Sequence, residues 1–238
     1  MTAHDDDEKT GTYASPPCFI HEVDQVDPKQ RADVMRWRKA ERERLLKERL
    51  AIPNGVRRRH GKLIAGQLQQ IIGDATGLTI SAYWPFRGEP DLRDLLQHLV
   101  SCGGRTALPV VIGRGQPLVF RVWAPGEPLQ RGVWNIPVPH GDEVVVPDVV
   151  IAPVVGFDRG CYRLGYGGGF FDRTLATMPN KPRVFGVGYS QAAIATIYPQ
   201  PHDIPMNVVV TEDGVTSPCE TKRRGRCPSS GILRQMAG

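Results

Sequence analysis

The residues between Arg163 and Arg173 have the types and spacing that chemistry on a phosphate group requires. Four glycines fall within the five positions 165–169, between an apolar run and a helix-like segment. A glycine-rich turn at a helix N-terminus leaves backbone N–H groups uncovered, and these groups bind anions together with the helix dipole. Arg163 and Arg173 flank the turn with positive charge, and Asp172 is placed where it could reach a Mg²⁺ ion carried by a phosphate.

The glycine-rich turn does not identify its ligand by itself. Its spacing differs from the Walker-type and dinucleotide-binding motifs, and no Gly-Lys-Ser/Thr sequence follows it. The alternative is a tight turn that only lets a helix pack on a sheet. Clustered glycines with flanking arginines and an aspartate favour a nucleotide phosphate.

The flanking segments indicate the elements that must position this turn. Residues 147–155 form a β-branched apolar run without alternation, which is typical of a buried parallel strand. Downstream, Phe171, Leu175 and Met178 have helical spacing. The remaining pattern predicts helices at 29–49, 56–72 and 91–102, strands at 79–84, 106–112, 118–123, 183–189 and 207–211, and mostly loop at 125–147.

The alternation of helices and strands predicts an α/β fold with three layers, in which a mostly parallel central sheet is flanked by helices. Ligands of such folds bind beyond the carboxyl ends of the strands, where residues 84–89, 157–158 and the glycine-rich turn are expected. We expect residues 1–28 to be a disordered tail, residues 29–215 to form the folded domain, and residues 216–238 to be a basic disordered tail.

The composition narrows the class of protein. The chain has 30 Lys and Arg against 25 Asp and Glu, and a net charge of +5 suits an enzyme with polyanionic substrates as well as a nucleic-acid binder. No apolar run approaches the roughly 20 residues that a membrane span needs, and no signal peptide is visible. The cysteines lack the spacing of a disulfide framework or a zinc site, so we expect Cys102 and Cys161 to be reduced thiols in a cytoplasmic protein.

Several motifs, in order along the chain, resemble those of the 5-formyltetrahydrofolate cyclo-ligase family, also called methenyltetrahydrofolate synthetases. The run Arg-Leu-Gly-Tyr-Gly-Gly-Gly-Phe-Phe-Asp at 163–172, after Phe157-Asp158, is similar to the family signature. The segments Tyr83–Leu92, Ala107–Val111, Trp134–Pro139, His202–Pro205 and Val208–Thr211 resemble other family segments. The resemblance spans roughly residues 36 to 214.

The resemblance implies an ATP-dependent ligase that uses Mg²⁺ and converts 5-formyltetrahydrofolate to 5,10-methenyltetrahydrofolate, with release of ADP and phosphate. It implies small-molecule partners only, with no membrane and no nucleic acid, in a cytoplasmic protein that is a monomer or a weak dimer. Phosphoryl transfer of this kind needs positioning and charge neutralisation more than covalent help from the protein.

The resemblance also implies roles for individual residues. The nucleotide would contact Arg163, Leu164, Gly165, Tyr166, Gly167, Gly168, Gly169, Phe170 and Phe171, with Arg163 and Tyr166 as catalytic residues. Asp172 and Asp203 would hold the metal. Trp84 and Glu89 would contact the folate, because a carboxylate can accept hydrogen bonds from the donor edge of the pterin. For Trp84 core packing is the alternative, for Glu89 a helix-start charge, and for Asp203 a turn or helix cap.

The basic helix at the N-terminal side matches the family less closely. The family carries Lys-x-x-x-Arg there, and its cations meet ATP, whereas this chain has Arg38-Lys39-Ala40-Glu41-Arg42. Arg42 fits the second position, and either Arg38 or Lys39 supplies the first cation. A solvated helix face with ion pairs is the alternative for this segment.

Two other functions remain open at this point. Basic helices and a basic tail would suit a nucleic-acid-binding protein, although they lack interleaved aromatic residues. A relative that binds a nucleotide but uses another small-molecule substrate would carry the same glycine-rich turn.

Overall fold

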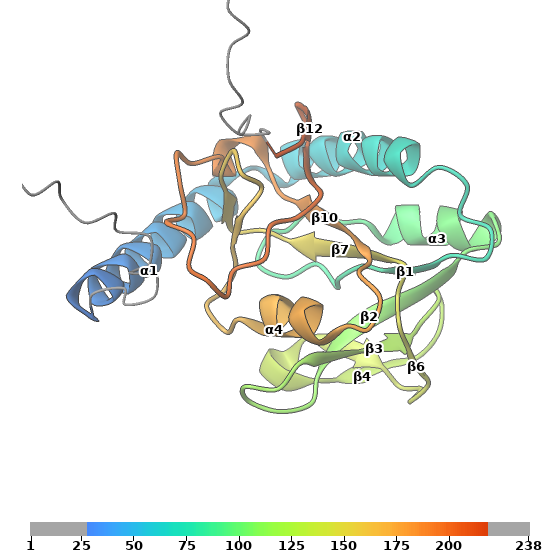
Figure 1. Ribbon diagram of the computed structural model, residues 1–238. Coiled ribbons are helices and arrows are strands. Elements are labelled where there is room, and N and C mark those ends of the chain that lie inside the picture. The colour runs from blue at the N-terminus through green and yellow to red at the C-terminus, as the bar shows by residue number, and fades with distance from the viewer. Residues whose placement is uncertain (1–27, 219–238) are drawn as a thin grey trace, which may run out of the picture.

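The computed structural model describes residues 28–218, and both expected tails lie largely outside them. Within this range the chain forms an eight-stranded sheet and four α-helices (Figure 1). The helices are α1 (Pro28–Ala51), α2 (Asn54–Ile72), α3 (Arg93–Ser101) and α4 (Phe170–Thr177), with short 3₁₀ turns at η1 (Val133–Asn135) and η2 (Ser190–Ala192).

The sheet has the order β12-β11-β10-β7-β1-β2-β3-β6. Its strands are β1 (Thr79–Ser81), β2 (Arg105–Val111), β3 (Leu118–Val122), β6 (Val144–Val145), β7 (Val149–Pro153), β10 (Arg183–Val187), β11 (Val208–Thr211) and β12 (Gly214–Thr216). The five central strands β11, β10, β7, β1 and β2 pair in parallel, and the outer strands β12, β3 and β6 pair antiparallel. The predicted α/β fold with a mostly parallel sheet is therefore confirmed.

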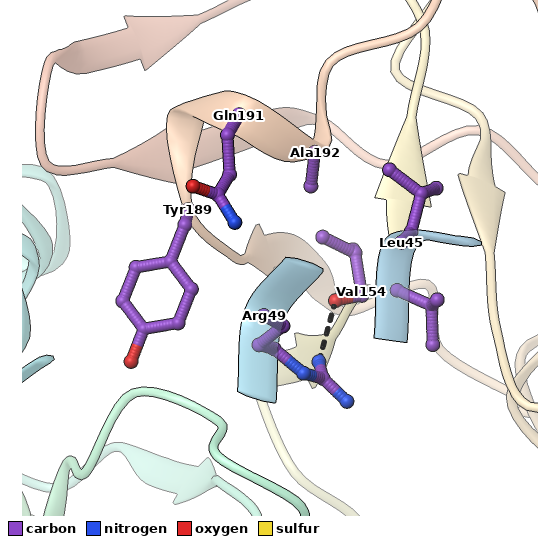
Figure 2. A pocket seen from close by; sticks show the side chains of 7 residues that line it. Leu45, Arg49, Val154, Tyr189, Gln191 and Ala192 are labelled. Atoms are coloured by element: carbon purple, nitrogen blue, oxygen red, sulfur yellow. Dashed lines mark hydrogen bonds between the residues drawn. The ribbon is translucent and has the colours of Figure 1, made fainter. Parts of the chain in front are cut away.

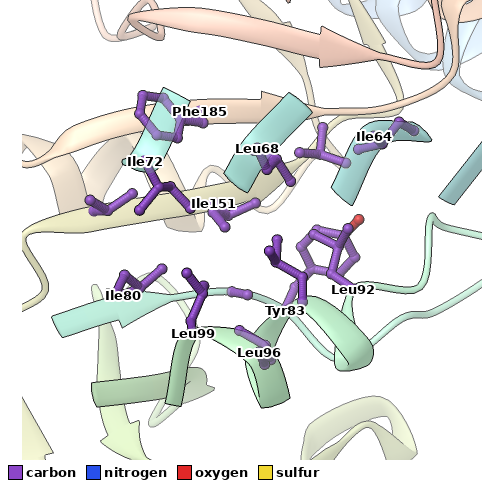
Figure 3. Close-up of a cluster of buried hydrophobic side chains, with 14 of the residues drawn as sticks. Ile64, Leu68, Ile72, Ile80, Tyr83, Leu92, Leu96, Leu99, Ile151 and Phe185 are labelled. Carbon is purple, nitrogen blue, oxygen red and sulfur yellow. The ribbon is translucent and has the colours of Figure 1, made fainter. Parts of the chain in front are cut away.

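The main core lies between one face of the sheet and helices α2 and α3 (Figures 1 and 3). In α2, Ile64, Leu68 and Ile72 recur at a spacing of four and are buried, so that one side of the helix faces the sheet. Alternate residues of the strands point to this same layer, and Ile151 of β7 and Phe185 of β10 belong to it.

The opposite face of the sheet is covered by α4. Val150, the neighbour of Ile151 in β7, packs there in a cluster with Phe171 of α4. Leu175 of α4 packs in a second cluster with Val184 of β10. Figure 1 shows α2 and α4 on opposite sides of the sheet, which makes the three layers that the sequence predicts.

Helix α1 lies beyond the carboxyl end of β7 rather than flat on either face (Figure 1). Leu45 of α1 is buried against Val155 and Leu164, which follow β7 in the chain. Parallel strands direct all their carboxyl ends to one edge of the sheet, and α1 therefore closes the edge at which ligands of such folds bind.

Some local details differ from the predictions. Residues 125–147 are mostly loop, as predicted, but they also contain β4 (Leu129–Arg131), paired with β5 (Pro137–Pro139), and the edge strand β6. Prolines are tolerated in edge strands because no partner needs their missing N–H, so the prolines did not exclude strands. The predicted strand 147–155 is shorter, and a hairpin of β8 (Gly156–Phe157) and β9 (Arg163–Leu164) separates it from the glycine-rich turn.

No helix in residues 28–218 has the length and apolar character that crossing a membrane would require. The two cysteines in this range, Cys102 and Cys161, are both free thiols, the first exposed and the second buried.

The core predicts a contrast between two leucines of α2. Leu68 is fully buried and Leu63 is exposed. Leu68→Ala should lower the free energy of unfolding by about 2–5 kcal/mol, because it leaves a cavity in the main core. Leu63→Ala should stay within about 0.5 kcal/mol of the unmodified chain. Urea denaturation measures both, and equal losses would contradict this assignment of the core.

Candidate active site

One face of α1 carries three arginines toward the carboxyl edge of the sheet. Arg38, Arg42, Leu45 and Arg49 recur at intervals of four, three and four residues, so their side chains share one side of the helix. Arg38 and Arg49 are each only 5% exposed. Buried guanidinium groups are costly unless they are paired, and each of the three finds partners outside α1.

The Gly loop, residues 165–169, runs from β9 into α4 and is largely exposed. Gly167 and Gly169 have φ angles of 96° and 62°, in the left-handed region that favours glycine. The Nε of Arg42 donates a hydrogen bond of 2.7 Å to the carbonyl of Gly165. This contact places a cation from α1 against the loop whose N–H groups and helix N-terminus favour an anion.

Arg163 and Asp172 form an ion pair beneath this loop. Arg163 Nη2 lies 2.8 Å from Asp172 Oδ2, and the guanidinium stacks over the ring of Phe171. Burial lowers the pKa of Arg163, although Asp172 and Asp203 oppose the shift. The Nη1 atom is buried without a hydrogen-bond partner among residues 28–218, which leaves a positively charged donor unused.

Arg38 and Asp203 form a second buried ion pair. Arg38 contacts both carboxylate oxygens of Asp203 and donates to the carbonyls of Ile197 and Tyr198. Burial would raise the pKa of Asp203, but the hydrogen bonds from Arg38 and the Gln200 amide outweigh it and lower the pKa. Of the two candidates for the first cation of the helix, Arg38 is buried and points into the site, whereas Lys39 is exposed.

The two aspartates predicted to hold a metal lie in one neighbourhood. Asp172 Oδ1 accepts a hydrogen bond of 3.2 Å from the backbone N–H of Ile204, the residue after Asp203. Both carboxylates are neutralised by arginines, and residues 28–218 contain no group of three His, Cys, Asp or Glu side chains arranged for a metal ion. This donor set fits a Mg²⁺ ion that arrives on a nucleotide, because Mg²⁺ often takes only one or two protein carboxylates.

A hydrogen-bonded chain joins α1, the Gly loop and the segment after β1. Arg49 Nη2 donates to the Tyr166 hydroxyl at 2.5 Å, and this hydroxyl donates to Glu89 Oε1 at 2.7 Å. The other oxygen of Glu89 accepts the N–H of Phe86 at 2.8 Å. Glu89 and Tyr166 are 77 residues apart in sequence, and only the fold brings them together.

Burial controls the protonation of the hydrogen-bonded residues Glu89 and Tyr166. Burial raises the pKa of Glu89 to about 7, although Arg49, the Tyr166 hydroxyl and the Phe86 N–H oppose the shift. Burial, together with the charge of Glu89, also raises the pKa of Tyr166, which keeps its hydroxyl protonated as a donor. Glu89 can therefore change its charge near neutral pH while Tyr166 cannot.

Trp84 is half buried and packs edge-to-face on Trp123, with the Arg93 guanidinium over its ring. It also packs against the main core. No hydrogen bond or ring contact joins it to Glu89 or Tyr166 within the described residues. The core-packing alternative therefore describes its surroundings, and its contact with a substrate stays a prediction.

Sequence reasoning missed Arg49 and Trp134 as members of this neighbourhood. Arg49 carries a helical signal, because it continues the row from Arg42 through Leu45 by one turn. Trp134 is 61% exposed, has a left-handed φ of 56°, and packs edge-to-face on Phe170 at the start of α4. Strained backbone at an exposed aromatic residue is more frequent at functional sites, but it is not visible in a sequence.

The raised pKa of Glu89 predicts a pH-dependent stability. The unfolded chain loses this proton near pH 4.5, and the folded chain near pH 7. Between these values the folded state binds more protons, so its stability falls as the pH rises, by up to about 1.4 kcal/mol per pH unit. Urea denaturation of the unmodified chain and of Glu89→Gln should show a difference that changes across this window. A constant difference from pH 4.5 to 7 would contradict the raised pKa.

Comparisons with known proteins agree with this geometry. The model of the 5-formyltetrahydrofolate cyclo-ligase family matches residues 34–212. The 5-formyltetrahydrofolate cyclo-ligase of Mycolicibacterium smegmatis is 32% identical over 175 residues, which cover 70% of this chain and 89% of that protein. The Escherichia coli protein of the same name is 34% identical over 145 residues, which cover 58% of this chain and 79% of that protein.

Solved structures show the same architecture. The 5,10-methenyltetrahydrofolate synthetase of Aquifex aeolicus has a TM-score of 0.66 and 28% identity, and the match covers 81% of this chain and 96% of that one. The Mycoplasma pneumoniae synthetase matches in fold, with a TM-score of 0.61 and 21% identity. This match covers 74% of this chain and 98% of that one. With the family model matched across the domain that carries this site, the chain belongs to the 5-formyltetrahydrofolate cyclo-ligase family.

Proposed function

We propose that this chain is a 5-formyltetrahydrofolate cyclo-ligase that uses Mg-ATP to make 5,10-methenyltetrahydrofolate, ADP and phosphate. The observation that carries the proposal is the contact between the two halves of the site. The Gly loop, suited to phosphate, touches the buried carboxylate suited to a pterin through the 2.7 Å hydrogen bond from Tyr166 to Glu89. A ligase needs both substrates within reach of one another.

The nucleotide side consists of the Gly loop with its arginines. Uncovered N–H groups of residues 165–169 would bind phosphate oxygens, with Arg42 held against the loop at Gly165. The Nη1 of Arg163 has no hydrogen-bond partner among residues 28–218 and is a buried donor that a phosphate oxygen would satisfy. The exposed ring of Trp134 beside Phe170 offers a flat apolar surface for a nucleotide base.

Asp172 is the carboxylate best placed to share a Mg²⁺ ion with the nucleotide, since its side chain is 17% exposed and lies in the first turn of α4 beside the Gly loop. The ion would neutralise charge on the phosphates and fix their position. Asp203 is the neighbour of Ile204, whose N–H donates to Asp172, and it forms an ion pair with Arg38. Asp203 therefore connects the surroundings of Asp172 to helix α1.

The folate side consists of Glu89 and its surroundings. An ionised Glu89 accepts hydrogen bonds, and the amino and ring N–H groups of a pterin are donors. In the proposed reaction the formyl oxygen attacks the terminal phosphorus of ATP and ADP leaves. The second folate nitrogen then attacks the activated formyl carbon, and phosphate leaves as the ring closes. The protein contributes position and charge neutralisation.

Two other proposals follow from the described residues. We propose a cytoplasmic location, because free thiols such as Cys102 and Cys161 persist in reducing compartments. We also propose that nucleic acid is not the partner of α1, because Arg38, Arg42 and Arg49 are turned inward to protein partners. On the exposed side of the helix, Arg36 and Arg44 pair with acidic residues of α1 itself.

Activity is tested directly by mixing the protein with Mg-ATP and 5-formyltetrahydrofolate. The conjugated methenyl product should appear by absorbance with one phosphate released for each product, and omission of any component should stop it. Hydrolysis of ATP at an undiminished rate without the folate would contradict the ligase.

Matched variants separate the two sides of the site. Arg42→Ala should weaken ATP use about ten- to a hundred-fold and leave the folate KM within about twofold, because a charged hydrogen bond is worth ~1.5–3 kcal/mol. Arg44→Ala is the control, since Arg44 lies on the same helix but pairs outward with Glu41 and Glu48. Glu89→Gln should raise the folate KM instead. The reverse pattern in steady-state kinetics would overturn the assignment of the two sides.

A further inference from the structure

Arg49 has no substrate role in the proposal above, yet it is a buried arginine of α1 that is only 5% exposed. Its Nη1 donates to the Val154 carbonyl at 3.2 Å, its Nη2 donates to the Tyr166 hydroxyl, and its Nε is buried without a partner among residues 28–218. Figure 2 shows it reaching past the Val154 carbonyl at a small cavity, whose lining includes Tyr189 and Leu45. Such a placement costs stability that a solvated arginine would not.

The charge of Arg49 acts on Glu89. The two residues share the Tyr166 hydroxyl, which accepts from Arg49 at 2.5 Å and donates to Glu89 at 2.7 Å. The guanidinium also lies over the Tyr166 ring, 5.7 Å from its centre. A hydroxyl between a cation and an anion is polarised by both. The Tyr166 hydroxyl therefore accepts from Arg49 and donates to Glu89, and the two charges fix these directions.

The other groups near Glu89 do not supply this charge. Tyr83 from the segment after β1 and Tyr189 from the segment after β10 face it, and both have raised pKa values through burial, so they remain neutral phenols. Arg57 of α2 lies beside Gly88 and pairs with Asn54. Arg49 is the cation whose charge lowers the pKa of Glu89 against the effect of burial.

We propose that Arg49 is a positioning residue for the folate side: acting through the Tyr166 hydroxyl, it holds the Glu89 carboxylate ionised and fixed in place. This inference rests on the proposed function, because it assumes that Glu89 receives the pterin donors. A protonated Glu89 loses acceptor capacity and presents a donor of its own to a donor edge. The buried arginine therefore sets the pH range in which the enzyme recognises its folate.

The kinetic test compares Arg49→Met with Arg49→Lys, and uses Arg44→Met as the control on the exposed side of α1. The value of kcat/KM for 5-formyltetrahydrofolate is measured from pH 5.5 to 9 with saturating Mg-ATP, and it reports groups of the ATP-bound enzyme before the folate binds. The acidic limb of Arg49→Met should move up by at least about one pH unit, with a loss of about fivefold or more at pH 7 that recovers toward pH 9. Arg49→Lys should restore part of the shift, and Arg44→Met should not move the limb.

A second measurement needs no substrate. The free energy of unfolding of each protein is compared with that of the same protein carrying Glu89→Gln, across the same pH range. The pH-dependent difference should end near pH 7 in the unmodified chain and extend to higher pH in Arg49→Met. If Arg49→Met does not fold, Tyr166→Phe replaces it, because it removes the shared hydroxyl and should move the window in the same direction.

The outcomes separate the two claims. An equal loss of kcat/KM at every pH, with an unmoved stability window, would make Arg49 a purely structural residue and overturn the inference. A window that moves in a protein that forms no methenyl product would support the coupling of Arg49 to Glu89 and overturn the proposed function. If the unmodified enzyme forms product, and both the acidic limb of kcat/KM and the pH window of the stability difference move in Arg49→Met, the proposed function and the inference are both supported.

Discussion

Burial of the arginine-bearing face of α1 is the constraint on which the site depends. A buried guanidinium needs partners, and this need fixes three otherwise separate loops in space. Arg38 holds the segment that contains Asp203, Arg42 holds the Gly loop at Gly165, and Arg49 holds Tyr166 and the end of β7. Leu45 supplies the apolar anchor between them, packed on Val155 and Leu164.

The parallel sheet explains why these loops are available at one edge. β1, β7, β10 and β11 run in the same direction, so the segments that follow them emerge on the same side. Glu89 comes after β1, the Gly loop follows the small β8–β9 hairpin after β7, and Asp203 lies in the segment that follows β10. Helix α1 crosses this edge and connects segments that are more than 100 residues away in the chain.

The electrostatics of the site differ between its two sides. The nucleotide side contains two compact ion pairs, Arg163 with Asp172 and Arg38 with Asp203. In each pair the two charges neutralise one another. On the folate side, a single buried carboxylate is balanced by a cation one hydroxyl away, and burial brings its pKa to about 7. A group balanced in this way responds to small changes in its surroundings, whereas tightly paired groups do not.

The sequence by itself determined the fold class, the Gly loop and the side chains available to a phosphate, because hydrophobic period and glycine spacing are local properties. The helices α1, α2 and α3 lie within a few residues of their predicted bounds. Local patterns predicted the loop between residues 125 and 147 but not the short strands within it, because the antiparallel pairing of β4 with β5 forms them and prolines at an edge do not prevent it.

Only the tertiary structure decided which of the polar residues meet. The sequence left Arg38 and Lys39 as alternatives, and the fold turns Arg38 inward because it lies one helical turn before Arg42 and can reach Asp203. It gave no reason to connect Arg49 or Tyr166 with Glu89, since hydrogen bonds between distant segments leave no periodicity in a single chain. The charge state of Glu89 is likewise a property of its burial, and burial is set by the packing of the whole domain.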